Sequence, residues 1–371
     1  MIFVGEWKEC QLGDLIIFQR GHDLPKTKMQ GGEYPVVGSN GIIGYHNEYT
    51  TEAPSITIGR SGNVGKPFLF KGRSWSHNTS LYIKEYKAVD PIFIYYFLQT
   101  LDLGNYAGGS AVPTLNRNHI HTLNVYVPTD IAEQRKIGAV LSAIDDKIEL
   151  NNAINENLHQ LIAAYYAEIF KDCEYSATIS DYADRVFSGG TPTTSNESYW
   201  NGSFKWLSSG ETSQRFIVDT EKTITQEGVD NSSTRLASKY NTVIASAGQG
   251  HTRGQASMLL TDSYVNQSII VVDSEKIYMP FIYWNLCGRY EELRVISNSN
   301  SIRGSLTTKM ISSFSSPKAD IALISKFSDL AWSAIYEIEK NCNEIIRLTT
   351  LRDTLLPKLM NGEIDVSAVK I

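Results

Sequence analysis

Few side chains of this sequence are arranged in a pattern typical of catalysis. The sequence contains no GxxxxGKS or GxxxxGKT phosphate loop, no GxGxxG after a strand, no GxSxG nucleophile elbow and no HExxH metal motif. The HIH run at 119–121 has no further histidine or carboxylate at helical spacing, so we do not interpret it as a metal site. The adjacent Asp145 and Asp146 point about 100° apart on a helix, and we interpret them as a solvated face. The sequence therefore predicts neither a catalytic centre nor a metal site.

Cysteine spacing and charge set the broad class of the protein. Its four cysteines, Cys10, Cys173, Cys287 and Cys342, lie far apart without a CxxC pair, which favours a reducing cytoplasm over a zinc site or a disulfide framework. We expect no membrane span, because no apolar run approaches about 18 residues, and no signal peptide, because the N-terminus has no positive leader. The net charge of −6 decides little, because residues 129–175 alone carry 4 basic and 9 acidic side chains and the flanking regions are near neutral.

The sequence is internally repeated. Residues 131–161 align without a gap with residues 321–351 and share eight identities, among them Asn151 with Asn341. Fainter matches precede this stretch, as HNTSLYI (77–83) lies over VNQSIIV (265–271). Such self-similarity indicates a duplicated unit, here in the order globular, helical, globular, helical.

The globular segments are expected to be α+β domains. Short β-rich runs such as PSITIGRSG and TVIASAGQG are separated by Gly, Asn and Ser, as in sheets connected by tight turns. Each segment then has one short aromatic helix after a proline, at 91–101 and 280–290, followed by a Gly/Ser/Asn-rich loop. We predict two similar domains and two helical regions related by a pseudo-twofold repeat, with boundaries at 1–128, 129–172, 173–316 and 317–371.

The helical regions carry a heptad pattern. Asp130 stands three residues before Glu133, a capping-box spacing that marks a helix start, and Asn361-Gly362 is a plausible stop after Pro357. We expect the two helices to pack antiparallel as a coiled coil, with Asn151 and Asn341 meeting as register-setting polar residues. The predicted seam residues are Ile137, Leu141, Ile144, Ile148, Asn151, Asn155, Leu158, Ile338, Asn341, Ile345, Leu348 and Leu355.

This organisation resembles the specificity subunit of type I restriction–modification systems. The residues that carry the resemblance are PTDIAEQRKIGAVLSAIDDKIELNNAINENL (128–158) and LRDTLLPKLMNGEIDV (351–366), which are typical of the two conserved helical regions of that family. SGGTP (188–192) and YWNGSFKWLSSGE (199–211) resemble the usual opening of a target-recognition domain. The first domain departs from this pattern, with RGHDLPKTK at 20–28.

The resemblance implies a non-catalytic DNA-reading subunit. Each target-recognition domain would read one half of a bipartite, gapped double-stranded DNA sequence, and the helices would act as a spacer and dock two modification (methyltransferase) subunits. Restriction subunits join such a complex where they are present. S-adenosylmethionine and ATP are expected only in partner subunits, so this chain would bind no cofactor.

Residues that could contact DNA are basic, amide, histidine and hydroxyl side chains on the loops, because Arg, Lys, Asn and Gln read base edges and basic or hydroxyl groups bind phosphates. In the first domain they are Arg20, Lys26, Lys28, Arg60, Ser61, Lys66, Arg73, His77, Asn116 and Arg117. In the second domain they are Lys205, Ser208, Gln249, His251, Arg253, Asn266, Gln267, Arg303 and Lys309.

Two alternatives from other classes stay open at this point. A self-contained DNA methyltransferase would need an NPPY-type catalytic motif and a cofactor glycine loop, which the sequence lacks. A non-catalytic coiled-coil scaffold with β-rich heads would bind protein rather than DNA. The same specificity function could also serve an orphan methyltransferase that works without restriction.

Overall fold

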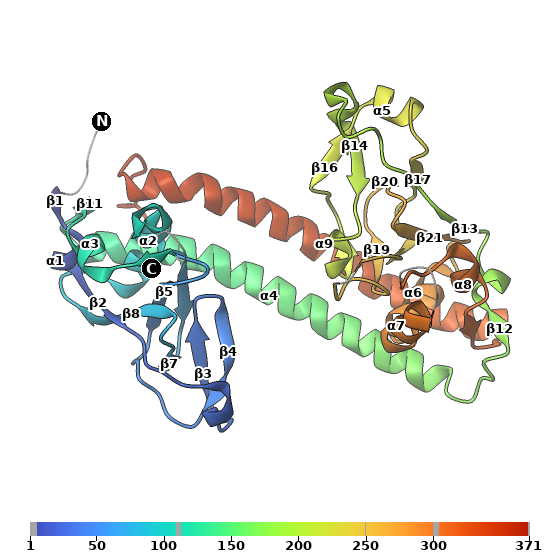
Figure 1. The fold of residues 1–371 in the computed structure, drawn as a ribbon, viewed down its shortest axis with the longest axis horizontal. Coiled ribbons are helices and arrows are strands. Elements are labelled where there is room, and N and C mark those ends of the chain that lie inside the picture. Colours follow the sequence, from blue (N-terminus) through green and yellow to red (C-terminus); the bar gives the residue numbers. More distant parts are fainter. Residues whose placement is uncertain (1–5, 109–112, 249, 300–303, 370–371) are drawn as a thin grey trace. The chain divides into compact units, whose positions relative to one another are not determined.

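The computed structural model describes residues 6–108, 113–248, 250–299 and 304–369. The chain forms two compact units, which are described separately. Unit 1 comprises residues 1–149 and 347–371, and unit 2 comprises residues 150–346. The long helices α4 (Ile131–Ile169) and α9 (Ile321–Met360) each contribute one part to either unit (Figure 1). The structure thus joins each globular segment with pieces of both helices, where the sequence suggested separate helical regions.

Unit 1 is built on two small sheets. An antiparallel sheet of order β2-β8-β5-β6 carries the core. The strands of a second sheet, of order β4-β3-β7, alternate with those of the first along the chain. Helix α2 (Pro91–Gln99) is capped by Asp90, whose carboxylate accepts from the backbone N–H groups of Ile92 and Phe93. The remaining elements of the unit are β1 (Trp7–Gln11), α1 (Leu12–Leu15), β2 (Ile16–Arg20), η1 (Lys26–Lys28), β3 (Tyr34–Gly38), β4 (Gly41–His46), β5 (Ser55–Gly59), β6 (Pro67–Phe70), β7 (Trp75–Ser76), β8 (Ser80–Tyr86), η2 (Leu103–Tyr106), β9 (Ala107–Gly108), β10 (Thr114–Leu115), α3 (Arg117–His121) and β11 (Asn124–Pro128).

Unit 2 repeats this plan with additional strands. Its two larger sheets have the orders β13-β21-β18-β19-β15 and β16-β14-β20-β17, and β12 pairs with β22. Its larger core joins helix α6 (Met279–Cys287) to both long helices through Phe281, Tyr166 and Phe327. The remaining elements are β12 (Ala177–Thr178), η3 (Ile179–Asp181), β13 (Arg185–Ser188), η4 (Glu197–Tyr199), β14 (Trp200–Leu207), η5 (Glu211–Ser213), β15 (Phe216–Ile217), β16 (Lys222–Ile224), α5 (Gln226–Asp230), β17 (Arg235–Ala237), β18 (Thr242–Ala245), β19 (Ala256–Leu259), β20 (Ser263–Val265), β21 (Ile269–Asp273), α7 (Tyr290–Ser299), α8 (Thr308–Ser312) and β22 (Ser315–Ser316).

The two units share one topology. The order β2-β8-β5-β6 in unit 1 matches β13-β21-β18-β19 in unit 2, and all of these neighbours pair antiparallel. In the second sheet, the parallel pair β3-β7 matches the parallel pair β14-β20. Each unit mixes sheets with helices, so the prediction of α+β units is confirmed.

Two glycines at matching positions show how closely the repeat is followed. A Cβ atom on Gly21 would lie 2.1 Å from the carbonyl oxygen of His77, and one on Gly189 would lie 1.9 Å from that of Val265. His77 and Val265 are themselves aligned residues of the sequence repeat. The SGGTP glycine is therefore required by backbone packing, and RGHDL serves the same purpose in unit 1.

We expect Gly21→Ala and Gly189→Ala each to destabilise its unit by about 1–3 kcal/mol or more, because a backbone carbonyl must move to admit the methyl group. Urea unfolding measures the change. Gly108→Ala is the control, since nothing lies within 4 Å of a Cβ atom built there. Equal stability of Gly21→Ala and Gly108→Ala would contradict the close approach.

The helix ends follow the sequence signals. Asp130 caps α4, with its carboxylate accepting from the N–H of Ala132 at 2.9 Å. Glu133, the expected reciprocal partner, instead accepts from the indole N–H of Trp7 at 3.3 Å. Helix α9 ends at Met360, and Gly362 follows in the left-handed region with a φ of 76°. No helix among the described residues has the length and hydropathy that a membrane span requires.

Within each unit the stretches of α4 and α9 run antiparallel. In unit 2, Tyr166 packs against Phe327 near one end and Asn155 contacts Asn341 further along. In unit 1, Asp145 meets Arg352. The antiparallel prediction is confirmed, and all twelve predicted seam residues are buried or half-buried.

The prediction that Asn151 contacts Asn341 is wrong, because each of these side chains bonds to a different residue. The Asn151 amide donates to Glu344 Oε2 at 2.8 Å, while the Asn341 amide donates to Asn155 Oδ1 at 2.9 Å. The helices are staggered so that each buried asparagine faces a different polar residue. Asp145 was also misjudged as solvated, since its carboxylate accepts from Tyr96 Oη at 2.6 Å and from Arg352 Nη1 at 2.8 Å.

Replacing Asn155 by leucine should lower the unfolding free energy by about 1–3 kcal/mol, because the buried Asn341 amide would lose its acceptor. Thermal or urea unfolding of the full chain measures this. Asn152→Leu makes the same change at an exposed position of the same helix and should leave stability nearly unchanged. If both variants unfold alike, the seam hydrogen bond contributes nothing.

Candidate nucleic-acid interface

Four of the predicted DNA-contacting residues of unit 1 line one cavity. Arg20 ends β2, Arg60 follows β5, and Asn116 and Arg117 begin helix α3. The chain brings them together because the N–H of Leu115 donates to the carbonyl oxygen of Arg60 at 2.9 Å. The cavity has a volume of about 680 Å³ and is lined by Gln19, Arg20, Arg60, Leu81, Thr114, Leu115, Asn116 and Arg117. We call it the arginine cavity.

The arginine cavity suits a polyanionic, planar ligand. Three arginines line it, of which Arg117 donates through Nη1 to the Phe18 carbonyl at 3.5 Å, and its described lining residues include no carboxylate. Each guanidinium offers a rigid fork of donors that matches the O6 and N7 acceptors of guanine or two phosphate oxygens. The Asn116 side chain is already used in part, since its Oδ1 caps α3 by accepting from the N–H of Asn118. The arrangement offers hydrogen-bond donors of the kind that contact base edges and phosphates.

The other candidates of unit 1 lie elsewhere on its loops. Lys26, Lys28 and Lys66 are exposed, and Ser61 is half-buried beside Arg60. Arg73 is exposed but bonded, with Nε 2.8 Å from Glu52 and its guanidinium over the ring of Tyr49.

His77 is less accessible for a DNA contact than its position on a loop suggested. It is half-buried, and its Nδ1 lies 3.0 Å from the hydroxyl of Thr79. Burial lowers the pKa of the imidazole below its usual value of 6.5, so His77 is a poor phosphate contact. Its carbonyl oxygen is also the group that Gly21 approaches.

In unit 2 three candidates gather at the ends of β14 and β20. Ser208 follows β14, and Asn266 and Gln267 follow β20; the N–H of Asn266 donates to Leu207 at 3.1 Å. The side chain of Gln267 is exposed and accepts from the hydroxyl of Thr191 in the SGGTP turn. Ser208 is held by Glu211, which accepts from its N–H and its hydroxyl.

Two predicted contacts of unit 2 have structural roles instead. Arg253 is only 5% exposed, and its guanidinium donates to the Gly304 carbonyl and to Asn298. Asn266 is 8% exposed, and its side chain accepts from the N–H of Ser268 at 2.9 Å. Both side chains are oriented by local backbone groups, so these two predictions are corrected.

The remaining candidates of unit 2 do not converge. Lys205 donates to the Val218 carbonyl at 2.8 Å and lies 3.3 Å from Asp219. His251 and Lys309 are exposed, the latter on α8. Gln249 and Arg303 lie outside the described residues.

The shared topology identifies which residues of unit 2 match the arginine cavity. Ser246 matches Arg60, because its carbonyl oxygen accepts from the N–H of Leu306 at 2.8 Å as that of Arg60 does from Leu115. Thr307 caps α8 as Asn116 caps α3, so Thr308 matches Arg117. Ser188 precedes Gly189 as Arg20 precedes Gly21. All three arginines of the arginine cavity are therefore replaced by hydroxyl side chains in unit 2.

Sequence reasoning missed the two other polar lining residues of the arginine cavity, Gln19 and Thr114, as well as the apolar Leu81 and Leu115. It considered basic, amide, histidine and hydroxyl residues of loops, while Gln19 lies within β2. The signal that could have identified Gln19 is a polar pair at the end of a strand whose preceding residues, Ile16 and Phe18, are buried.

Comparisons with known proteins agree with one another. The family model described as the type I restriction modification DNA specificity domain matches residues 5–160. The chain is 28% identical over 157 residues to the EcoprrI specificity subunit of Escherichia coli, covering 41% of this chain and 38% of that protein. It is 24% identical over 340 residues to the EcoR124I/EcoR124II specificity subunit of Escherichia coli, covering 85% of this chain and 83% of that protein.

A solved structure has the same fold. The crystal structure of a type I restriction–modification S subunit from M. genitalium superposes with a TM-score of 0.67 and covers 96% of both chains. Its sequence identity to this chain is 18%, so the likeness concerns the fold.

Proposed function

Because the chain belongs to the family of type I restriction–modification DNA specificity subunits, we propose that it recognises the bipartite DNA target of a modification complex. Residues 1–128 act as one target-recognition domain and residues 173–316 as the other. Each domain reads one half of a gapped duplex sequence. The chain itself supplies no catalytic group; its role is to place a methyltransferase on the correct DNA.

The observation that carries this proposal is the duplication of one loop-bearing fold with different residues at the matching positions. Two copies of a DNA-reading domain on one chain suit two half-sites. Arginines in unit 1 and hydroxyl side chains in unit 2 suit half-sites of different sequence, since a guanidinium favours guanine and a hydroxyl is less selective. A symmetric protein-binding scaffold would have no need for this difference.

The long helices connect the two recognition domains and set the distance between the half-sites. Their lengths, 39 residues for α4 and 40 for α9, correspond to about 60 Å at 1.5 Å per residue. Exposed apolar side chains on them, such as Leu150 and Leu161, suit the docking of two modification subunits. S-adenosylmethionine and ATP act in partner subunits, restriction subunits join where present, and the complex works on DNA in the cytoplasm.

The decisive experiment is to map methylated adenines in a genome that expresses this chain together with its modification subunits. The expected result is a single bipartite sequence with a fixed gap, methylated in both halves. Loss of all site-specific methylation on deletion of this chain alone would support the assignment. Methylation that continues unchanged without the chain would refute it.

A salt titration separates DNA recognition from a protein-binding scaffold. The complex should lose affinity for its target duplex steeply as salt rises, because neutralised phosphates release counterions. A complex that prefers no duplex at any salt concentration would favour the scaffold alternative.

A further inference from the structure

Helix α3 carries the HIH run at 119–121, which we did not interpret as a metal site and to which DNA reading assigned no role. Its three side chains have different environments in the structure. His119 is exposed, Ile120 is fully buried in the core of unit 1, and His121 is half-buried. His119 is thus an ordinary surface residue and Ile120 anchors the helix, while the role of His121 follows from its contacts.

The ring of His121 accepts a hydrogen bond from the main chain. The backbone N–H of Phe18 in β2 donates to His121 Nε2 at 2.9 Å, and the two rings are stacked with their centroids 6.1 Å apart. A backbone N–H can only donate, so Nε2 must be unprotonated and the imidazole neutral. The geometry therefore specifies the protonation state of this histidine.

Phe18 needs this acceptor because of its place in the sheet. Strand β2 is an edge strand of the order β2-β8-β5-β6, and its register with β8 shifts between Ile17 and Phe18. Phe18 is 0% exposed, so water cannot replace a missing partner of its N–H group. A buried N–H group without an acceptor is costly. Loss of the His121 acceptor should therefore displace the end of β2.

Helix α3 contacts both backbone polar groups of Phe18. Arg117 stands four residues before His121, so the two side chains lie on one face of the helix. Arg117 Nη1 lies 3.5 Å from the carbonyl oxygen of Phe18. The two residues that follow in β2, Gln19 and Arg20, line the arginine cavity. The placement of these two side chains therefore depends on how α3 holds Phe18.

Helix α1 limits the movement of His121 from another side. A Cβ atom on Gly13 would lie 3.2 Å from His121 Cβ, so the two helices are in close contact there. The Gly13 carbonyl accepts from Lys87 Nζ at 2.7 Å. Asp14, the acidic residue of α1, accepts from the N–H of Gln11 at 3.0 Å. Helix α1 thus brings a cation, and no unpaired carboxylate, toward the imidazole.

The charges around the imidazole oppose its protonation. Burial, and to a lesser extent the cations of Arg117 and Lys87, lower the pKa of His121 below its usual value of 6.5. Strand β2 adds Arg20, another cation, and η2, which also packs against α3, carries the exposed Tyr106. His121 is therefore neutral at pH 7 and takes up a proton only as the pH falls below 6.5.

Unit 2 carries different residues at the matching positions. Because Thr308 matches Arg117, the residue of α8 that matches His121 is Ser312. A serine hydroxyl takes up no proton in this pH range. Protonation of His121 should therefore affect the half-site that unit 1 reads and leave the other half-site unchanged.

We propose that His121 is a positioning residue for DNA recognition by unit 1. Its neutral imidazole fixes the end of β2 and thereby places Gln19 and Arg20 against the DNA half-site. A proton on Nε2 removes the acceptor, sets two N–H groups against each other and releases the end of the strand. This inference rests on the proposed function and adds to it a proton-dependent step in the reading of one half-site.

The test measures how well the complete complex of this chain and its modification subunits discriminates between duplexes. The probes are a duplex with the target found by methylation mapping and duplexes with one base pair changed in either half-site. Affinities are measured at fixed salt concentration from pH 7.5 to pH 5. In wild type, discrimination in one half-site should fall about fivefold to tenfold as the pH falls, because one buried hydrogen bond is lost. Discrimination in the other half-site should stay constant.

Three variants separate positioning from general stability. His121→Leu removes the acceptor and should show the reduced discrimination already at pH 7.5. His121→Gln keeps an acceptor that takes up no proton, so it should discriminate as wild type does at pH 7.5 and show no pH dependence. His119→Gln makes the same change at the exposed neighbouring histidine and should follow wild type at every pH.

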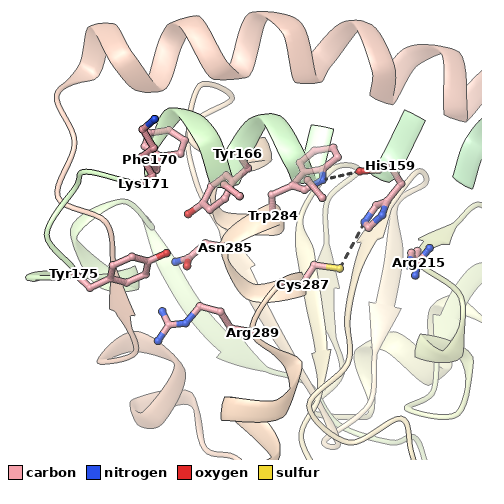
Figure 2. Close-up of a pocket in the computed structure, with 13 residues that line it drawn as sticks. His159, Tyr166, Phe170, Lys171, Tyr175, Arg215, Trp284, Asn285, Cys287 and Arg289 are labelled. Atoms are coloured by element: carbon pink, nitrogen blue, oxygen red, sulfur yellow. Dashed lines mark hydrogen bonds between the residues drawn. The ribbon is translucent and has the colours of Figure 1, made fainter. Parts of the chain in front are cut away.

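The buried histidine of unit 2 does not interfere with this test. His159 lies beside Cys287, and its carbonyl accepts from the indole N–H of Trp284 (Figure 2). Burial lowers the pKa of His159 to about 4, so its imidazole stays neutral from pH 7.5 to pH 5. A pH effect that His121→Gln abolishes therefore originates in unit 1.

Three results would overturn the inference. They are unchanged discrimination in a folded His121→Leu complex, a wild-type discrimination that stays constant down to pH 5, and a pH dependence that persists in His121→Gln. Urea unfolding at pH 7.5 shows whether each variant is folded. If His121→Leu is not, the pH profiles of wild type and His121→Gln decide. A wild-type complex without any duplex preference at pH 7.5 would instead refute the proposed function itself.

Discussion

Replacing Arg60 by serine, the residue at the matching position of unit 2, is expected to weaken binding of the complete target DNA about tenfold to a hundredfold. A bidentate arginine contact with a guanine contributes about 1–3 kcal/mol of discrimination, and each factor of ten in affinity corresponds to about 1.4 kcal/mol. Arg60 lines the arginine cavity together with Arg20 and Arg117, so its loss removes one of the three arginines of that cavity. The effect should be confined to the half-site that unit 1 reads.

The measurement combines target affinity with a methylation map. In the Arg60→Ser complex, one base position of one half-site should become degenerate while the other half-site stays unchanged. Arg117→Thr should act on the same half-site. Lys84→Ala, which removes an exposed cation of β8 outside the cavity, is the control and should leave both half-sites as they are. Equal relaxation of both half-sites would contradict the assignment, and a uniform loss of affinity without relaxed specificity would assign Arg60 to a phosphate instead.

The elements of this fold follow from local sequence signals, and the contacts between them do not. The Asp130 cap and the heptads after it are contained within one helix, so their positions and their buried face could be predicted. The partner of Asn151 could not, because it depends on the axial stagger of two helices. A shift of one turn exchanges Asn341 for Glu344 as the facing residue. Asp145 was misjudged for the same reason, since Tyr96 and Arg352 reach it from distant parts of the sequence.

In the candidate site, too, the sequence identifies single residues but not the contacts between them. Loop composition drew attention to Arg60 and Arg117, but that both line one cavity depends on a backbone hydrogen bond between Leu115 and Arg60. Composition also drew attention to Arg253, which lies on a Gly-containing loop as Arg60 does and cannot be distinguished from it by sequence. That arginine is buried because the Gly304 carbonyl accepts from it. Whether a loop arginine faces solvent or its own backbone is a tertiary property, so the sequence could supply only the set of candidates.

The second large effect is expected from His159 as the pH falls. This residue is buried on α4, where its ring stacks on Trp284. Burial, and to a lesser extent the nearby Arg215, lower its pKa from 6.5 to about 4. Above pH 6.5 the imidazole is neutral in both the folded and the unfolded chain, so it contributes no pH dependence. Between pH 6.5 and about 4 the unfolded chain binds a proton that the folded chain does not, and the unfolding free energy falls by about 3 kcal/mol in total.

Urea unfolding at pH 7, 6, 5 and 4, followed by tryptophan fluorescence, should therefore separate wild type from His159→Gln. Carboxylates titrate in both proteins and cancel in the difference. Poorer packing can make His159→Gln less stable than wild type at pH 7 by some amount. As the pH falls to 4, the unfolding free energy of wild type should fall by about 3 kcal/mol more than that of His159→Gln, because glutamine takes up no proton. Asn157→Ala, an exposed change on the same helix, should run parallel to wild type throughout. A gap between wild type and His159→Gln that stays constant from pH 7 to pH 4 would mean that the imidazole binds a proton as readily in the folded chain as in the unfolded chain, and it would contradict the lowered pKa.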